Sequence, residues 1–371
     1  MNKIVPSDNP SKHVTVIDVI RGVAALTVAL FHIREMTWIG VRSYWKYYGA
    51  EVSLSSAFAY FSFPLIWGSI GVPIFFVISG YVIHSGSRKS LLNINQARNF
   101  WLRRFVRIWP TLIVALIITL ACDSFANRYG IHGKFGDLSI RNAALNLLGI
   151  VGLAGSPYGS NGALWSLSIE IQFYIIYPLA LIAWRKIGPT KMLLFTLILT
   201  LIGYLLFKSY GIRSFLMYYF SWWLGAYVAD QTGKANARTK HFWMSILLLL
   251  TGCAVHFWKN EILTFMIWAT GFATLLFYIL DRDTRPISAS KIKSLGSQIY
   301  YAIGKCGDFS YSLYAVHMPV SVAFIMFFLD GEKQSNIFWV ALVLPVTMVG
   351  AYMVYRTAEI PSIRMLRQLK K

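Results

Sequence analysis

The chain has 371 residues, of which 56% are hydrophobic and only 13% are charged. Soluble proteins carry roughly a quarter charged residues, so this composition excludes an ordinary soluble enzyme. The formal net charge of +20 would suit a nucleic-acid partner. However, basic loops of a membrane protein explain the same excess, because they fix its topology and contact anionic lipid. We therefore expect membrane lipid, and no nucleic acid, among its partners.

Apolar runs of roughly 17 to 25 residues, the length that lets a helix cross a bilayer, recur along the chain. They predict an all-α, polytopic transmembrane helical bundle of about ten spans. The spans lie near 15–33, 69–86, 109–125, 164–184, 190–207, 213–230, 242–258, 262–280, 309–329 and 336–357. The interrupted apolar stretch 53–67 predicts an interfacial or re-entrant segment. We expect a single integral-membrane domain over residues 1–371, without an appended soluble domain.

Loop charges predict the orientation of the chain in the membrane. With the N-terminus inside, the inner segments hold 24 lysines and arginines and the outer ones hold 10, with Arg21 inside a span. The excess comes mainly from residues 87–107, 281–293 and 364–371. Because cytoplasmic loops are enriched in lysine and arginine, both termini are expected to face the cytoplasm.

Four ionisable residues interrupt the predicted spans: Arg21, His32, Glu170 and His317. Charges at membrane depth are costly, so such residues usually line a polar path or an active site. Arg21 and His32 are eleven residues apart, which places them on one helix face about 16 Å apart along the axis. His32 could instead cap its span at headgroup level, and His317 could be a hydrogen-bonded core histidine.

The fourth span carries a second polar face. Ser166, Glu170 and Tyr174 repeat every four residues and therefore share one side of a helix. Glu170 is expected at the depth of His32, where a carboxylate would orient the imidazole for general-base catalysis. Alternatively, Glu170 stays protonated and hydrogen-bonded within the bundle. Trp165, at the outer end of this span, is a candidate for stacking on sugar rings.

A basic cluster precedes the third span. Arg103, Arg104 and Arg107 lie within two helical turns, and guanidinium groups bind phosphate oxygens bidentately. The same arginines could serve only as a positive-inside anchor. The preceding FFVISGYVIHSGSRK segment adds three candidates for the same site, Ser79, Gly80 and Arg88. No metal site is predicted, because the three cysteines have no paired or metal-ligand spacing.

Five stretches resemble, in order, motifs of the acyltransferase-3 family of integral-membrane O-acyltransferases, which act on bacterial polysaccharides and related acceptors. They are IDVIRGVAALTVALFHI, FFVISGYVI, RRFVRIWP, LWSLSIEIQFYIIYP and FSYSLYAVHMPV. With the tail EIPSIR, the resemblance covers nearly the whole chain. One position departs from it, because Ile171 stands where family members often carry a second glutamate.

The resemblance implies a multi-pass enzyme of the bacterial inner membrane, with acetyl-CoA as the usual cytoplasmic donor and a sugar hydroxyl as acceptor. It makes His32 the essential histidine, Arg21 its partner, and Arg104 with Arg107 the donor-associated pair. His32 would act as a general base or as an acyl carrier. The sequence does not distinguish acetyl from succinyl or other short acyl groups. It predicts neither which carbohydrate is the acceptor nor the oligomeric state.

Two other classes of function compete with an enzyme. A transporter of a lipid-linked sugar or small anion would use the buried charges as a relay, and it would move its solute without cleaving a thioester. A non-catalytic scaffold in a polysaccharide-export assembly would leave the four buried ionisable residues unexplained.

Overall fold

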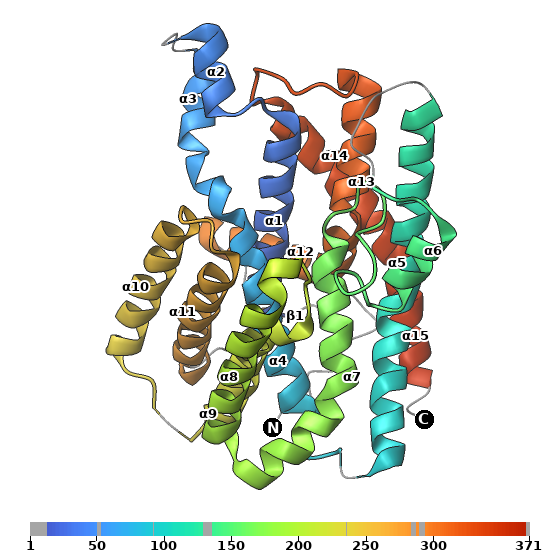
Figure 1. The fold of residues 1–371 in the computed structure, drawn as a ribbon. Helices are drawn as coiled ribbons and strands as arrows, with labels where there is room; N and C mark the ends of the chain where they lie inside the picture. The colour runs from blue at the N-terminus through green and yellow to red at the C-terminus, as the bar shows by residue number, and fades with distance from the viewer. Residues whose placement is uncertain are drawn as a thin grey trace.

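The computed structural model describes residues 13–49, 53–91, 93–128, 136–234, 236–282, 287–288 and 294–368. Its named strands are β1 (His13–Val14) and β2 (Ile287–Ser288), which pair antiparallel; its other named elements are helices. Within the described residues, eight helices are long and apolar enough to cross a membrane. The predicted all-α polytopic bundle is therefore confirmed (Figure 1).

The helices divide into those that are long or spanning and shorter ones between them. The long or spanning elements are α1 (Val16–Thr37), α3 (Leu54–Phe61) continued by η1 (Phe63–Ile70) and α4 (Gly71–Ser87), α5 (Ile94–Arg128), α7 (Leu164–Ile187), α8 (Pro189–Phe207) with η2 (Lys208–Tyr210), α11 (Glu261–Asp281), α13 (Ser310–Leu329), and α14 (Trp339–Val354) with η5 (Tyr355–Glu359) and α15 (Ile360–Gln368). The others are α2 (Val41–Tyr48), α6 (Ile140–Leu147), η3 (Phe215–Tyr218), α9 (Tyr219–Gln231), α10 (Thr239–His256) and α12 (Leu295–Asp308).

Two of the predicted spans are helical but are not among the eight. The predicted span 213–230 is divided into η3 and the 13-residue helix α9. The span predicted at 242–258 corresponds to α10, whose first turn carries the polar residues Thr239, Lys240 and His241. The interrupted stretch 53–67 folds as α3 and η1, and it leads into α4.

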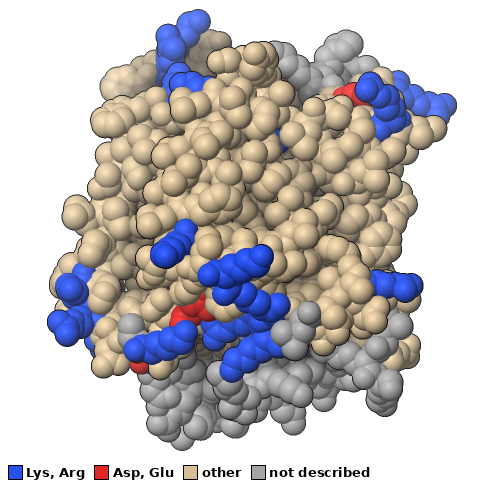
Figure 2. Space-filling model, turned by 60° about the horizontal axis from the view of Figure 1, so that its bottom comes forward, with Lys and Arg blue, Asp and Glu red and all other residues tan. Residues whose placement is uncertain are grey.

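Basic side chains gather at one end of the bundle. Figure 2 shows Lys and Arg concentrated over the lower part of this face, with a nearly uncharged middle band and a smaller basic group at the top. A charge-free band between polar ends is what a bilayer requires. Most of the basic segment 281–293 and both chain ends lie outside the described residues. The cytoplasmic orientation of the termini stays a prediction.

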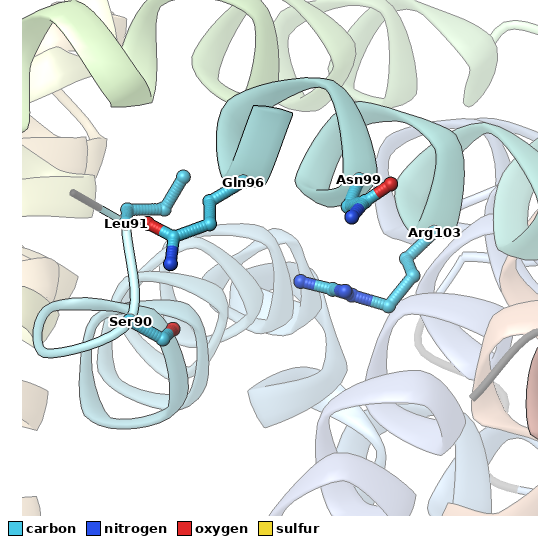
Figure 3. A pocket seen from close by; sticks show the side chains of 5 residues that line it. All are labelled: Ser90, Leu91, Gln96, Asn99 and Arg103. Carbon is cyan, nitrogen blue, oxygen red and sulfur yellow. The ribbon is translucent and has the colours of Figure 1, made fainter. Parts of the chain in front are cut away.

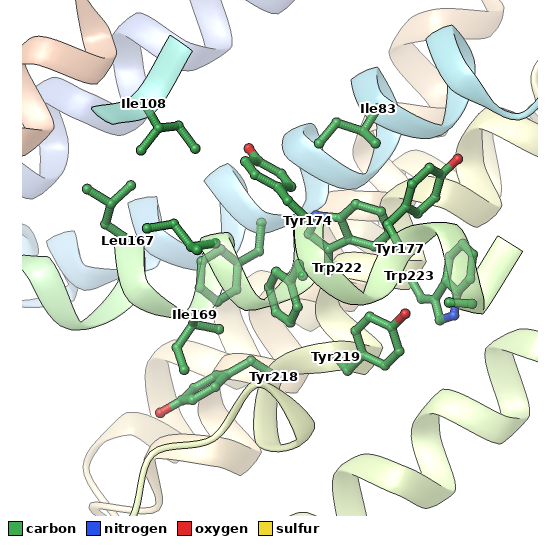
Figure 4. Close-up of a cluster of buried hydrophobic side chains, with 14 of the residues drawn as sticks. Ile83, Ile108, Leu167, Ile169, Tyr174, Tyr177, Tyr218, Tyr219, Trp222 and Trp223 are labelled. Atoms are coloured by element: carbon green, nitrogen blue, oxygen red, sulfur yellow. The ribbon is translucent and has the colours of Figure 1, made fainter. Parts of the chain in front are cut away.

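Aromatic side chains form the centre of the largest core cluster. Figure 4 shows rings from α7, η3 and α9 packed together, among them Tyr177, Tyr219 and Trp222. Tyr177 and Trp222 are completely buried, with ring centroids 5.4 Å apart. Buried aromatics of this size dominate packing energetics, so this cluster holds α7 rigidly against α4 and α9.

Two prolines lie inside the helices that carry Glu170 and His317. Proline has no N–H, so Pro178 in α7 and Pro319 in α13 each leave free the carbonyl four residues earlier. Side chains from other segments satisfy both carbonyls. The Trp101 indole N–H donates to the Tyr174 carbonyl at 3.1 Å, and the Asn161 amide donates to the Ala315 carbonyl at 2.9 Å.

Candidate active site

Helix α1, which carries Arg21 and His32, begins with a capping box. The Thr15 hydroxyl accepts from the backbone N–H of Asp18 at 3.2 Å, and the Asp18 carboxylate accepts from the Thr15 backbone N–H at 3.0 Å. These two bonds fix the start of α1, from which Arg21 and His32 then follow on one continuous helix. The Asp18 carboxylate also interacts electrostatically with Arg21.

His32 meets His317 across the interface of α1 and α13. Their Nδ1 and Nε2 atoms are 3.0 Å apart and their ring centroids are 5.1 Å apart. His317 is completely buried, while His32 is partly exposed. The two histidines are 285 residues apart in sequence, and no local spacing predicts that they pair.

The hydrogen-bond partners of His317 determine the tautomers of both neutral rings. Its Nδ1 lies 2.8 Å from the Tyr314 carbonyl oxygen, and a carbonyl can only accept. Nδ1 of His317 therefore carries the proton, and its Nε2 accepts from Nδ1–H of His32. This leaves Nε2 of His32 with a free lone pair, which is the form of imidazole that can remove a proton.

The sequence predicted that Glu170 lies beside His32, but in the structure its partner is Tyr174. Glu170 accepts a hydrogen bond from the Tyr174 hydroxyl, which also lies 3.2 Å from the Ser79 hydroxyl on α4. One turn earlier on α7, the Ser166 hydroxyl meets the Tyr314 hydroxyl at 2.5 Å. α7 contacts the histidine-bearing helix through Ser166, and Glu170 lies one helical turn further along the same face of α7, where it is partly exposed. His317 takes the orienting position that Glu170 was predicted to hold.

Arg21 belongs to a buried group of charges below the histidine pair. Arg107, Glu170 and Glu359 all act on it electrostatically. Glu359 is 1% exposed and accepts a hydrogen bond of 2.6 Å from the Ser312 hydroxyl. Glu359 ends the π-helical turn η5, and single π-helical turns often occur at functional sites.

Sequence reasoning missed Glu359, which was noted only within the tail motif EIPSIR. The available indication was a carboxylate that closes a long apolar run, the same observation that singled out Glu170. Asp230 was also missed. It is 2% exposed and binds the side chains of Arg88, His84 and Trp184.

The arginines of α5 diverge around the helix. Arg103 lines a pocket of about 160 Å³ with Ser90, Leu91, Gln96 and Asn99, and its side chain extends into that pocket (Figure 3). Arg104 lines a separate pocket of about 290 Å³ whose other walls are mostly aromatic and aliphatic. Its guanidinium lies over the rings of Phe100 and Tyr174, at 5.3 and 5.6 Å from their centroids. Arg107 acts on Arg21 and Glu359.

Ser79 and Gly80 on α4, and Arg88 directly after it, contact other parts of the protein, and their predicted role at the donor site stays a prediction. Arg88 forms a 2.6 Å ion pair with Asp230, so its charge is already matched by a protein group. Gly80 packs directly against the Trp222 carbonyl, where a Cβ atom would collide with the α9 backbone. Both residues therefore hold α4 against α9. Glu170, Tyr174, Ser166 and Tyr314 form a row of hydrogen-bonded polar side chains, which we call the polar path. Ser79 joins it, because its hydroxyl lies near Tyr174 and accepts from the Trp222 indole at 3.3 Å.

Trp165 stands at the start of α7. Its ring is 5.3 Å from that of Tyr218, and the Arg213 guanidinium lies 4.7 Å above it. This partly exposed ring leaves a surface near the end of the polar path that contains Ser166. Within the described residues, no group of three or more His, Cys, Asp or Glu side chains is arranged to hold a metal ion.

The site and the fold together define a multi-pass membrane protein with a histidine pair and a group of arginines inside its helical bundle. The family model described as an acyltransferase domain matches residues 14–356, and the chain belongs to this acyltransferase-3 family. The predicted family is therefore confirmed. No solved structure matches the chain.

Three curated relatives illustrate the similarity. Nodulation protein 10 of Rhizobium leguminosarum is 23% identical over 83% of this chain and 85% of its own length. The peptidoglycan O-acetyltransferase OatA of Listeria monocytogenes is 31% identical over 36% of this chain, and acyltransferase MdmB of Streptomyces mycarofaciens is 31% identical over 34%. These two alignments cover only 23% and 31% of the relatives' own lengths.

Proposed function

We propose that the protein is a membrane O-acyltransferase of the bacterial inner membrane. It moves an acetyl or other short acyl group from cytoplasmic acyl-CoA to a hydroxyl group of a cell-surface or lipid-linked carbohydrate. Family membership supports acyl transfer, and the name of the Listeria relative supports acetyl as the group and a glycan as the acceptor. The buried charges within spanning helices support a reaction centre inside the membrane.

The histidine pair is the observation that carries this proposal. With Nδ1–H of His32 held by His317, the free Nε2 removes the proton from the acceptor hydroxyl. The hydroxyl oxygen then attacks the thioester carbonyl, the new C–O ester bond forms, and the C–S bond breaks. The departing thiolate takes the proton back from His32, which leaves free CoA and the acylated acceptor.

The arginines supply the donor side of the reaction. Arg103, Arg104 and Arg107 lie in the first half of α5, and phosphates prefer guanidinium partners. The pocket at Arg103 also presents the polar side chains of Asn99 and Ser90 to a nucleotide. Arg21 connects this region to His32 along a single helix, so the donor's neutral arm would follow α1 inward.

Removing His32 tests the proposal. His32→Ala should lower acyl transfer by roughly a hundred- to ten-thousandfold, the usual contribution of general acid–base catalysis. The measurement is incorporation of labelled acetyl groups from acetyl-CoA into cell-envelope material, in membranes that contain equal amounts of the protein. Transfer near the unmodified level would show that His32 is neither the base nor an acyl carrier.

A further inference from the structure

The connection before α7 is tied to the helix that carries His317. Asn161 is completely buried, and its amide Nδ2 donates to the Ala315 carbonyl that Pro319 leaves free. Two residues later, the backbone N–H of Ala163 donates to the Met318 sulfur at 3.2 Å. The loop of residues 158–163 therefore rests on the bend of α13 beside the histidine pair.

The same loop is tied to the far end of α5. Asp123 is completely buried, and its Oδ2 atom accepts from the backbone N–H of Ser160 at 2.6 Å. Gly159, with a φ of +53°, permits this approach, because a Cβ atom there would collide with the Asp123 carboxylate. Asp123 lies about 30 Å along α5 from the donor-side arginines, since nearly twenty residues at 1.5 Å each separate them.

Two polar atoms at this junction are left without partners. They are Asp123 Oδ1 and Asn161 Oδ1, each buried and without a hydrogen bond among the described residues, while the Ser160 hydroxyl interacts with the Asp123 carboxylate. Buried polar atoms in folded proteins are almost always paired, so two such atoms at one place require an explanation. A carboxylate oxygen and an amide oxygen both accept hydrogen bonds. Their natural complement is a molecule rich in O–H donors.

We propose that Asp123 and Asn161 form the hydroxyl-binding subsite of the acceptor, a site for a polyol such as a carbohydrate. The inference rests on the proposed acyl transfer and assigns its acceptor to this junction. Oδ1 of Asp123 and Oδ1 of Asn161 accept from neighbouring hydroxyl groups of one sugar, while the adjacent hydroxyl is directed to His32. Gly159 and Gly162 flank Ser160 and Asn161, and the proposal requires the backbone to rotate at these glycines so that a ligand reaches the buried atoms.

The subsite also accounts for chemical selectivity. A carboxylate and an amide oxygen attract hydroxyl donors and repel anions, so an acidic molecule is disfavoured at this end of the path. The arginines at the other end have the opposite preference. The two substrates are therefore sorted by charge: the polyanionic donor binds at α5 residues 103–107 and the neutral polyol at the opposite end.

The test separates binding of the acceptor from handling of the donor. Asp123→Asn replaces one acceptor oxygen by a donor group, and Asn161→Asp keeps an acceptor oxygen but loses the bond to Ala315. Asn146→Asp is the matched control, because Asn146 on α6 is equally buried and also has an unpaired Oδ1, yet its bonds go to Asn142 and Ser156. The probe is isolated cell-envelope material, titrated against full-length protein in membranes with labelled acetyl-CoA.

Asp123→Asn should raise the amount of envelope material needed for half-maximal transfer by roughly ten- to a hundredfold, as for loss of a charge-assisted hydrogen bond. Binding of CoA should be unchanged, and Asn146→Asp should transfer normally. Equal transfer by Asp123→Asn and the unmodified protein would overturn the subsite. So would a fall in folded protein or CoA binding that matches the fall in transfer, since the atoms would then be structural. If the unmodified protein transfers nothing, the proposed function itself fails.

Discussion

Replacing His317 by leucine tests the tautomer argument without touching the proposed base. Leucine fills the buried space but cannot accept from Nδ1–H of His32, which would then lose this partner at a partly buried position. An unmade hydrogen bond of this kind costs about 1 to 3 kcal/mol. Nδ1–H would no longer be fixed, so the tautomer that exposes a basic Nε2 would lose that advantage. At 1.36 kcal/mol per tenfold, kcat should fall roughly five- to a hundred-and-fiftyfold.

The assay is the initial rate of acetyl transfer from acetyl-CoA to envelope material, with substrate concentrations varied separately. His317→Gln should recover much of the rate, because its amide oxygen can accept from His32. His256→Gln is the control, since the rings next to His256 are those of Trp268 and Phe257, with centroids 5.5 and 6.2 Å away. An unchanged rate in His317→Leu would refute the argument. A loss as large as that of His32→Ala, without rescue by glutamine, would make His317 itself the reacting group.

The remaining predictions concern the donor site and helix packing. Arg104→Ala and Arg107→Ala should each raise the acetyl-CoA concentration needed for half-maximal transfer by roughly ten- to a hundredfold. The exposed Arg98→Ala should not, and an unchanged donor dependence with reduced membrane insertion would favour a topological role. Gly80→Ala should destabilise the protein by about 1 to 3 kcal/mol, because its Cβ meets the Trp222 carbonyl. A lower melting temperature in detergent with unchanged donor affinity would show this, whereas unchanged stability would contradict the close α4–α9 contact.

The periodicity of the sequence was sufficient to predict the membrane helices and the shared helix of Arg21 and His32, because these properties depend on residues close together in the chain. It could not predict the partner of His32. Glu170 was chosen from expected depth alone, whereas the structure shows that α7 contacts α13 through Ser166 and Tyr314. A shift of one helical turn changes which side chains meet.

The sequence also could not show which partner a basic loop residue binds. Arg88 was grouped with the donor arginines by proximity in sequence, but its partner Asp230 lies 142 residues further on. Two of the prolines inside the helices, Pro178 and Pro319, were the overlooked local indication. Each leaves a carbonyl free, and the sequence could have prompted a search for the side chains that satisfy them.

The central claim is that the acyl group crosses the protein while the donor stays on the arginine side. Purified protein in sealed vesicles of known orientation should consume acetyl-CoA only when it is offered on the side of Arg103 and Arg107. It should acylate envelope material offered on the side of Ser160, and free CoA should appear only on the donor side, because a polyanion does not cross an apolar interior. Transfer that requires both substrates on one side would contradict the account. Solute movement without thioester cleavage would identify a transporter instead.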